Sequence, residues 1–226
     1  MPSKDGRANA QSKTLRDVFG GDPPAGAKVT FDADEPIYTS GDIDDAIYLV
    51  ESGQVKLFMS SAAGKDCLIA IYAPGEIFGE SCFTGTMKRF ESASAMRRTV
   101  VLRMTRREFT AEVGRASLTE ALLQHLASRS AERQTAVFDL TTMDSERRLA
   151  KVLLQLGQKL GKAEGAHYLI EQRISQEELA QIVGTTRPRV TAFMQRFRAL
   201  GIIDTPGPRA IRIDRQAARD FVHRGE

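Results

Sequence analysis

The sequence predicts an α+β fold: an N-terminal antiparallel β-domain, then a long helix, then a helix–turn–helix followed by a β-hairpin. Three observations support this order. Short β-rich runs alternate with glycines between Ala27 and Met104, and beyond Thr105 apolar residues recur every three or four positions. Near the C-terminus, a proline stands between two arginines at the head of a helical segment. Each pattern is typical of one kind of element.

The first pattern predicts a sandwich or barrel. The runs AIYLVESGQVKLFMS, DCLIAIYAPGEIFGE and SASAMRRTVVLRMT are rich in β-branched and aromatic residues and follow one another at a spacing of about ten residues. Glycine supplies backbone angles that other residues resist, and it marks the expected turns. These glycines are Gly41, Gly53, Gly64, Gly75 and Gly79.

The second pattern predicts one long helix with a stripe that is apolar at both ends and polar in the middle. The stripe consists of Leu118, Leu122, Leu126, Arg129, Arg133, Val137 and Leu140. A helix of this length needs a partner for its apolar positions. The residues leave two partners open: the β-domain of the same chain, or the same helix of a second subunit.

The third pattern predicts two helices joined by a tight turn, after a helix from Glu146 to Gly161. Ser175 and Glu178 form a capping box, so a helix begins there and ends at Gly184. Pro188 fits only in the first turn of the next helix. The apolar stripe of that helix consists of Val190, Phe193, Met194 and Phe197, and its other side is basic. The following segment, GIIDTPGPRAIRIDR, predicts a β-hairpin.

Composition limits the class of protein. The 226 residues are 42% hydrophobic and 27% charged, which is typical of a globular protein. The longest apolar run, about six residues from Leu68 to Ala73, is too short for a bilayer, and the polar N-terminus lacks the features of a secretion signal. We therefore expect a cytoplasmic protein without a membrane partner. Cys67 and Cys82 are the only cysteines; we expect both to be reduced and structural, and no metal site.

Charge is distributed unevenly. The net charge is +3, but residues 144–226 hold 15 Lys and Arg against 10 Asp and Glu, which leaves 17 against 19 for the rest. A basic C-terminal part indicates a polyanion partner, although such a surplus is also common on ordinary solvated surfaces.

The chain resembles the cyclic-AMP receptor protein (Crp/Fnr) family of bacterial transcription regulators over roughly residues 28–213. The matching segments are GDIDDAIYLVESGQVKL, PGEIFGES, RRLAKVLLQL and ISQEELAQIVGTTRPRVTAFMQRFRALGII. We expect residues 1–14, which are mostly polar, to be a disordered tail. The resemblance implies a cyclic-nucleotide-binding-type β-roll as effector domain (15–115), a dimerisation helix (116–143) and a winged helix-turn-helix (144–226). It also implies a homodimer through Leu118, Leu122, Leu126, Val137 and Leu140.

The resemblance further implies an inverted-repeat site on double-stranded DNA. Arg187 matches the family's first base-reading position, and Thr191 and Gln195 share its exposed helix face. Thr186 is the expected helix cap, while Arg189, Arg196 and Arg209 of the wing are candidates for phosphates. Pro188, Arg189 and Ala192 depart from the family pattern, so the operator sequence cannot be transferred.

The effector pocket implied by the resemblance departs further from the family pattern than the DNA-binding helix does. Its members would be Gly79, Glu80, Ser81, Arg89, Ser92, Ala93, Arg133 and Gln134. Glu91 stands where cyclic-nucleotide binders carry a phosphate-binding arginine, and a carboxylate there would repel the phosphate. Arg89 could reach the pocket only if the loop is remodelled. We therefore expect no cyclic AMP in the usual pose and no certain cofactor. There is no cysteine cluster for iron–sulfur sensing, and Cys82 is a weak candidate for a haem ligand or thiol switch.

The predicted function is a homodimeric, sequence-specific transcription regulator, with an effector in the β-roll and, for an activator, RNA polymerase as partner. One alternative is a ligand-independent regulator of the same fold. An alternative from another class is a nucleotide-processing enzyme, for which no paired carboxylates or nucleophile–base constellation is visible.

Overall fold

The structure, a computed structural model, describes residues 14–20, 26–172, 174–207 and 209–223. The predicted disordered tail therefore lies almost entirely outside the described residues. The strands are β1 (Ala27–Phe31), β2 (Pro36–Tyr38), β3 (Ala46–Ser52), β4 (Val55–Ser60), β5 (Asp66–Tyr72), β6 (Ile77–Phe78), β7 (Ser92–Ala95), β8 (Thr99–Thr105), β9 (Lys162–Glu164), β10 (His167–Ile170), β11 (Ile203–Gly207) and β12 (Ala210–Asp214). The helices are η1 (Leu15–Val18), η2 (Glu80–Thr84), α1 (Arg106–Arg115), α2 (Thr119–Thr142), α3 (Ser145–Leu160), α4 (Gln176–Val183), α5 (Arg187–Ala199) and α6 (Arg215–His223).

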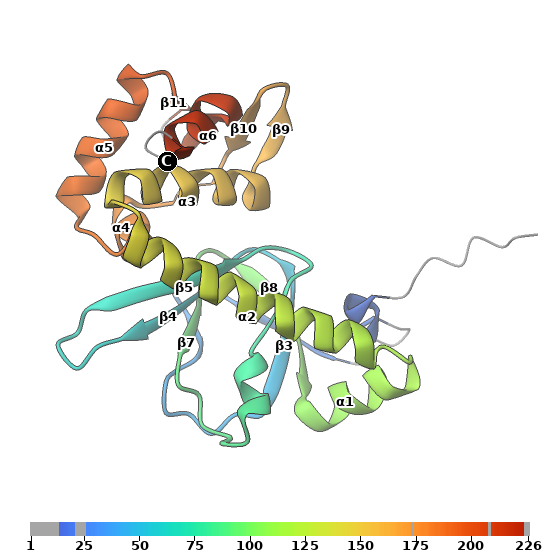
Figure 1. Cartoon of the computed structure of the whole chain (residues 1–226). Helices are drawn as coiled ribbons and strands as arrows, with labels where there is room; N and C mark the ends of the chain where they lie inside the picture. Colours follow the sequence, from blue (N-terminus) through green and yellow to red (C-terminus); the bar gives the residue numbers. More distant parts are fainter. Residues whose placement is uncertain (1–13, 21–25, 173, 208, 224–226) are drawn as a thin grey trace, which may run out of the picture.

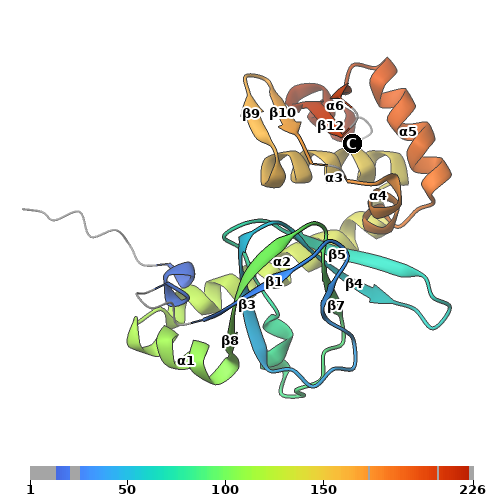
Figure 2. The same cartoon turned by 180° about the vertical axis from the view of Figure 1, so that it is seen from behind.

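The N-terminal part consists of two four-stranded antiparallel sheets, as predicted. Their strand orders are β1-β8-β3-β6 and β2-β7-β4-β5 (Figures 1 and 2). The core between the sheets is aromatic: the rings of Tyr48 and Phe78 stack with their centroids 5.0 Å apart, and Tyr38 packs beside them. Strand β3 is buried from Ala46 to Val50, which explains its continuous apolar run, whereas β1, β4 and β5 keep exposed residues.

Helix α2 crosses the β-domain and continues to the C-terminal part (Figure 1). It is preceded by α1, a short helix that the sequence analysis did not separate from it. Thr105 caps α1 and forms a capping box with Glu108. Leu118 is 8% exposed and belongs to a core cluster with η1, α1 and strands β3 and β8, and Leu122 packs against that cluster. The N-terminal turns of α2 are therefore covered by their own β-domain.

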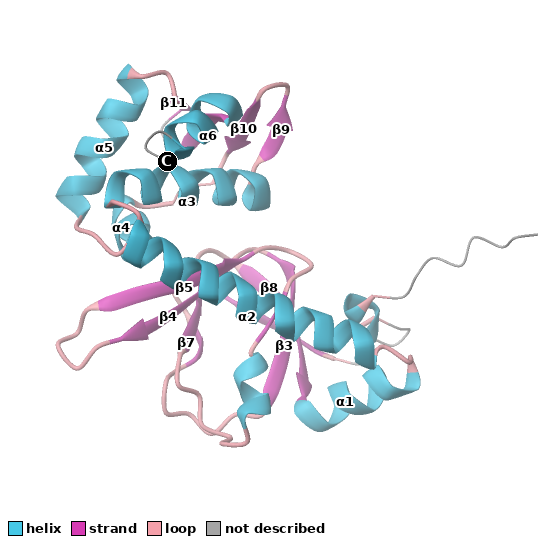
Figure 3. Ribbon diagram, viewed as in Figure 1, coloured by secondary structure: helices cyan, strands magenta, loops and turns pink. Residues whose placement is uncertain are grey.

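The C-terminal part contains the predicted helix–turn–helix and hairpin (Figure 3). Ser175 and Glu178 form the capping box of α4, Gly184 ends that helix with a left-handed φ of 71°, and Pro188 lies in the first turn of α5. Strands β11 and β12 pair around the proline-rich turn and join β10 and β9 in one sheet. The β9–β10 hairpin and α6 were not predicted.

Helix α4 docks the C-terminal part on strand β5 of the β-domain. Leu68 and Ile71 of β5 belong to the same buried cluster as the core of the helix–turn–helix. Lys56 lies 3.8 Å from Glu178, and Lys159 lies 3.0 Å from Glu76. The two parts are thus held by both apolar and charged contacts. None of the described helices combines the length and apolarity that a bilayer crossing requires.

Candidate DNA-binding surface and effector site

Helix α5 buries one side and exposes a basic one, as its sequence pattern predicts. Val190, Met194 and Phe197 are at most 3% exposed and pack in the C-terminal core. Thr186 occupies the N-cap position in an extended conformation, but its side chain makes no capping hydrogen bond. Pro188 needs no amide partner at the helix start. The helix therefore presents its first turn to solvent with Arg187 exposed.

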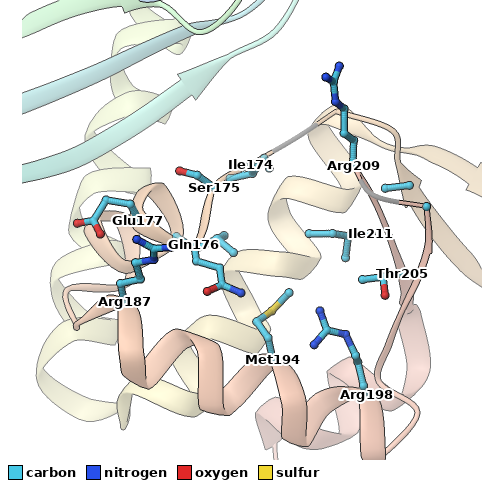
Figure 4. Close-up of a pocket in the computed structure, with 13 residues that line it drawn as sticks. Ile174, Ser175, Gln176, Glu177, Arg187, Met194, Arg198, Thr205, Arg209 and Ile211 are labelled. Carbon is cyan, nitrogen blue, oxygen red and sulfur yellow. The ribbon is translucent and has the colours of Figure 1, made fainter.

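A cleft of about 600 Å³ separates α5 from the wing and from the start of α4 (Figure 4). Met194, Ile211 and other apolar side chains line its inner surface. Three arginines line it as well: Arg187 and Arg198 from α5, and Arg209, which points away from the wing. No ion pair or hydrogen bond to these three guanidinium groups is formed by the described residues. They form a group of free positive charges around a concave surface.

The remaining predicted DNA contacts differ in their availability. Gln195 is exposed. The Arg189 guanidinium lies 5.7 Å from the centre of the Phe193 ring, and Arg196 is paired with Glu146 at 2.9 Å. The Thr191 hydroxyl lies 2.5 Å from Gln176 Oε1 and 3.0 Å from the carbonyl oxygen of Arg187. Thr191 therefore joins α5 to the first turn of α4.

Two residues of this surface, Gln176 and Arg198, were missing from the predicted site. Arg198 follows Arg187 by eleven positions, or about three helical turns, so the two lie on the same side of α5. That spacing was a usable signal. The contact of Gln176 with Thr191 depends on how α4 packs against α5, which no local pattern indicates.

The Gly79–Ser81 turn stands at the edge of the aromatic core, but its glutamate faces α2. Gly79 has a φ of 91°, and a Cβ there would lie 3.1 Å from the carbonyl oxygen of Ala46, so glycine is required. Glu80 Oε1 is 2.8 Å from His125 Nε2 and 3.5 Å from Arg129 Nε. Burial alone would raise the pKa of Glu80, but the hydrogen bond from His125 and the charge of Arg129 hold it below its usual value. This carboxylate stabilises the α2 contact.

Arg89 reaches the pocket, which the sequence analysis expected only after remodelling of the loop. It is 2% exposed. Its guanidinium donates to Gly79 O at 2.7 Å and to Ser81 Oγ at 2.8 Å, contacts the carbonyl of Ala46, and pairs with Asp44 at 2.8 Å. Burial alone would raise the pKa of the Asp44 carboxyl. The hydrogen bonds and the charge of Arg89 have the larger combined effect with its other donors, so the pKa is lowered. The Arg89 guanidinium is therefore already bound by hydrogen-bond acceptors and a carboxylate of the same chain.

Glu91, expected to repel a phosphate, lies beside this network. Its side chain is 3% exposed, and Oε1 accepts hydrogen bonds from Ser81 Oγ at 2.6 Å and from the Tyr38 hydroxyl at 3.3 Å. Ser92 and Ala93 are buried in β7, and Ser92 Oγ accepts from the amide of Ser40. By contrast, Arg133 and Gln134 are exposed on α2. Of the predicted pocket residues, those from Gly79 to Ala93 therefore lie close together, whereas Arg133 and Gln134 lie outside the pocket.

The two cysteines differ. Cys82 is buried among the apolar residues near η2, and burial raises the pKa of its thiol to about 11, which disfavours a reactive thiolate. Cys67 is a free, exposed cysteine on β5. Among the described residues, no three His, Cys, Asp or Glu side chains are grouped as metal ligands.

Comparisons with known proteins agree with this architecture. A sequence model of the cyclic nucleotide-binding domain matches residues 28–115, and one of the Crp-like helix-turn-helix domain matches residues 147–218. The chain is 31% identical over 180 residues to the CRP-like cAMP-activated global transcriptional regulator of Mycobacterium tuberculosis, covering 79% of this chain and 80% of that one. It is 31% identical over 185 residues to the cyclic AMP receptor protein of Thermus thermophilus, covering 81% and 82%.

Solved structures show the same fold. FixK2 of Bradyrhizobium japonicum superposes with a TM-score of 0.77 at 20% identity, covering 87% of this chain and 96% of that one. A CooA mutant from Carboxydothermus hydrogenoformans gives a TM-score of 0.76 at 22% identity, covering 93% and 96%. The matches to the two family models and to the 31% identical transcriptional regulator set the enzyme alternative aside. With its β-domain, long helix and winged helix–turn–helix in this order, the chain belongs to the Crp/Fnr family of DNA-binding transcription regulators.

Proposed function

We propose that this regulator binds an inverted-repeat operator as a homodimer, with α5 in the major groove and the wing on the flanking backbone. The observation that supports this most directly is the set of three unpaired arginines around the cleft between α5 and the wing. Because no described residue pairs with their guanidinium groups, these arginines are available to the phosphates and bases of a polyanion. The family is typically dimeric, and two copies of α5 would match two half-sites about one helical turn apart.

The arginines divide into two roles by position. Arg187, at the exposed start of α5, suits bidentate recognition of a guanine, and Gln195 lies two turns further along the helix. Arg209 at the wing and Arg198 at the far end of the cleft suit phosphates. Arg189 and Arg196 are further phosphate candidates, although Arg196 must leave Glu146 to make such a contact. RNA polymerase is the expected second partner if the protein activates transcription, which would take place in the cytoplasm.

The effector is a separate question. The Mycobacterium tuberculosis and Thermus thermophilus relatives are named for cyclic AMP. In this chain, Glu91 faces Ser81, and Arg89 is bound to Asp44, so the groups that would meet a phosphate are already paired. We infer that cyclic AMP is not bound in the usual pose and that the ligand-independent alternative is favoured.

The test of DNA binding is a selection from random duplexes, followed by salt titration of the wild type and two variants. Arg187→Ala should lose about 1–3 kcal/mol and relax preference at particular base pairs, whereas Arg209→Ala should weaken all sequences alike and lower the salt slope by about one. Arg97→Ala, on the β-domain, is the matched control and should bind like the wild type. Failure to enrich an inverted repeat, or an unchanged profile for Arg187→Ala, would contradict the proposal.

A further inference from the structure

The unusual feature of the β-domain is an anion buried beside a buried cation without direct pairing between them. Glu91 and Arg89 are 3% and 2% exposed. Ser81 lies between them: its Oγ accepts from Arg89 Nη1 at 2.8 Å and donates to Glu91 Oε1 at 2.6 Å. The hydroxyl of Tyr38 is a second donor to the same oxygen, and the Tyr38 ring lies 4.2 Å from the Arg89 guanidinium.

Burial of a carboxylate is costly unless donors replace its water shell. Here two hydroxyl groups donate to one carboxylate oxygen, and the guanidinium of Arg89, which is itself paired with Asp44, lies one hydrogen bond away. Burial and the Glu91 charge both raise the pKa of Tyr38, so the phenol keeps its proton and acts as donor. The second oxygen, Oε2, is buried and accepts no hydrogen bond from the described residues. The anion is thus held through one oxygen only.

We propose that Glu91 is a built-in ligand of this domain: its carboxylate fills a small-oxyanion site formed by Ser81, Tyr38 and Arg89, so that no anionic effector enters there. The site belongs to the chemical class that accepts one carboxylate or similar oxyanion. It is occupied by the chain itself and becomes an open site when Glu91 is truncated. This inference deepens the proposed function, because it assigns the regulator an effector pocket that needs no anionic ligand.

Truncation gives a direct test. Glu91→Ala removes a CH2–COO⁻ group, which is the size of acetate, and leaves both hydroxyl donors and Arg89 in place. The variant should unfold about 5 °C or more below the wild type, because buried donors lose their acceptor. Sodium acetate should then raise its Tm in a saturable way, relative to sodium chloride at equal ionic strength. Propionate, which adds a methylene to a closed site, should stabilise it less.

Two controls separate this mechanism from general salt effects. Glu91→Gln keeps the volume, so acetate has no space to enter and should raise its Tm no more than chloride does. Glu120→Ala, at an exposed position on α2, should match the wild type throughout. The wild type itself should show no saturable response to acetate, phosphate or cyclic AMP.

Several results would overturn the proposal. A Glu91→Ala variant as stable as the wild type would show that the carboxylate fills no site, and equal acetate responses in Glu91→Ala and Glu91→Gln would show a nonspecific effect. A saturable rise in the Tm of the wild type with phosphate or cyclic AMP would show that the site is open. These Tm measurements need no DNA, so they are independent of the selection experiment. If the wild type selects no operator, the proposed DNA-binding function is contradicted, but the acetate response of Glu91→Ala still tests the Glu91 site.

Discussion

At the scale of single residues, Glu80 shows how a side chain expected to meet a ligand can serve the fold instead. Its carboxylate binds His125 and Arg129 of α2, and its pKa is lowered from 4.5. A lowered folded-state pKa means that the charged form stabilises the fold above the unfolded-state value. This contribution is lost as pH falls below about 4.5 and through the folded-state pKa.

Glu80→Gln should therefore unfold at lower temperature than the wild type at neutral pH, and the gap should shrink as the pH is lowered below about 4.5. The measurement is the Tm of both proteins across an acidic pH series. Glu120→Gln, at an exposed position of α2, should show no such convergence. A gap that stays constant with pH would mean that packing rather than the charge of Glu80 is responsible.

The network that links Arg89 and Glu91 through Ser81 gives a second prediction at this scale. Calorimetry should detect no tight binding of cyclic AMP to the wild type, because Arg89 is engaged by Asp44 and Glu91 places a negative charge beside Ser81. Glu91→Arg should create or strengthen binding by replacing that charge with a cation. Tight binding to the wild type that is abolished by Arg89→Ala would instead show that the network opens for the ligand.

These residues also mark the limit of sequence reasoning about the site. The resemblance to the Crp/Fnr family located the pocket segment and identified Glu91 as its anomaly, because both follow from matching local order along the chain. It could not show that Arg89 is satisfied by Asp44, 45 positions away. Such a contact depends on sheet packing. The same applies to the pairing of Glu80 with His125.

At the scale of elements, the joint between α2 and the C-terminal part is fixed by two basic side chains of α3, Arg148 and Lys151. Arg148 of α3 donates through Nη1 to the carbonyl oxygen of Met143 at 2.6 Å and through Nε to that of Val183 at 2.8 Å. Met143 ends α2, and Val183 is the last residue of α4. Lys151 adds an ion pair with Asp139 of α2 at 2.6 Å. Three helix ends are thereby fixed relative to one another.

Arg148→Ala should cost about 1–3 kcal/mol of unfolding free energy, because helix-end carbonyls lose a charged donor. Hydrogen exchange should speed up at the ends of α2 and α4. Arg147→Ala is a matched control from the adjacent position: its guanidinium binds the carbonyl oxygen of Val222, so its loss should affect α6 instead. Identical exchange profiles for the two variants would refute this assignment of Arg148.

Helices whose ends are marked by characteristic residues could be predicted from the sequence. The capping box at Ser175, the end at Gly184 and the place of Pro188 each follow from a local rule, and all three were confirmed. The β9–β10 hairpin was missed because its strands are only three and four residues long, and because β10 pairs on its other side with β12, which is remote in sequence. Short elements of this kind are decided by tertiary contacts.

At the scale of the whole molecule, helix α2 has two distinct faces, whereas its sequence pattern predicted a single stripe. Leu118, Leu122 and Arg129 are turned to the β-domain of the same chain. A second series follows the alternating three- and four-residue spacing of a coiled-coil seam. It consists of Leu123, Leu126, Ser130, Arg133, Val137 and Leu140. Of the two partners left open by the sequence, the β-domain of the same chain covers the first face of this helix.

The second series is the better candidate for the dimer interface, because much of its apolar surface is uncovered in one chain. Leu123 is 63% exposed, Val137 61% and Leu140 50%, and neighbouring Phe138 is 63% exposed. These apolar residues lie at the two ends of the seam, on either side of Ser130 and Arg133, and isolated chains rarely leave such apolar groups in water. Substitution at Leu122, by contrast, would also disturb the β-domain core, so it is a poor test of assembly.

The double variant Val137→Asp, Leu140→Asp should be monomeric by light scattering, because two aspartates from each chain would meet in an apolar seam. Its β-domain should stay folded, since neither side chain belongs to that core. Ile43→Asp, at an apolar residue 74% exposed between β2 and β3, should remain dimeric. A monomer presents one α5 at a time, so its affinity for the inverted repeat should fall to that for a single half-site. A double variant that still scatters as a dimer would place the interface outside this seam.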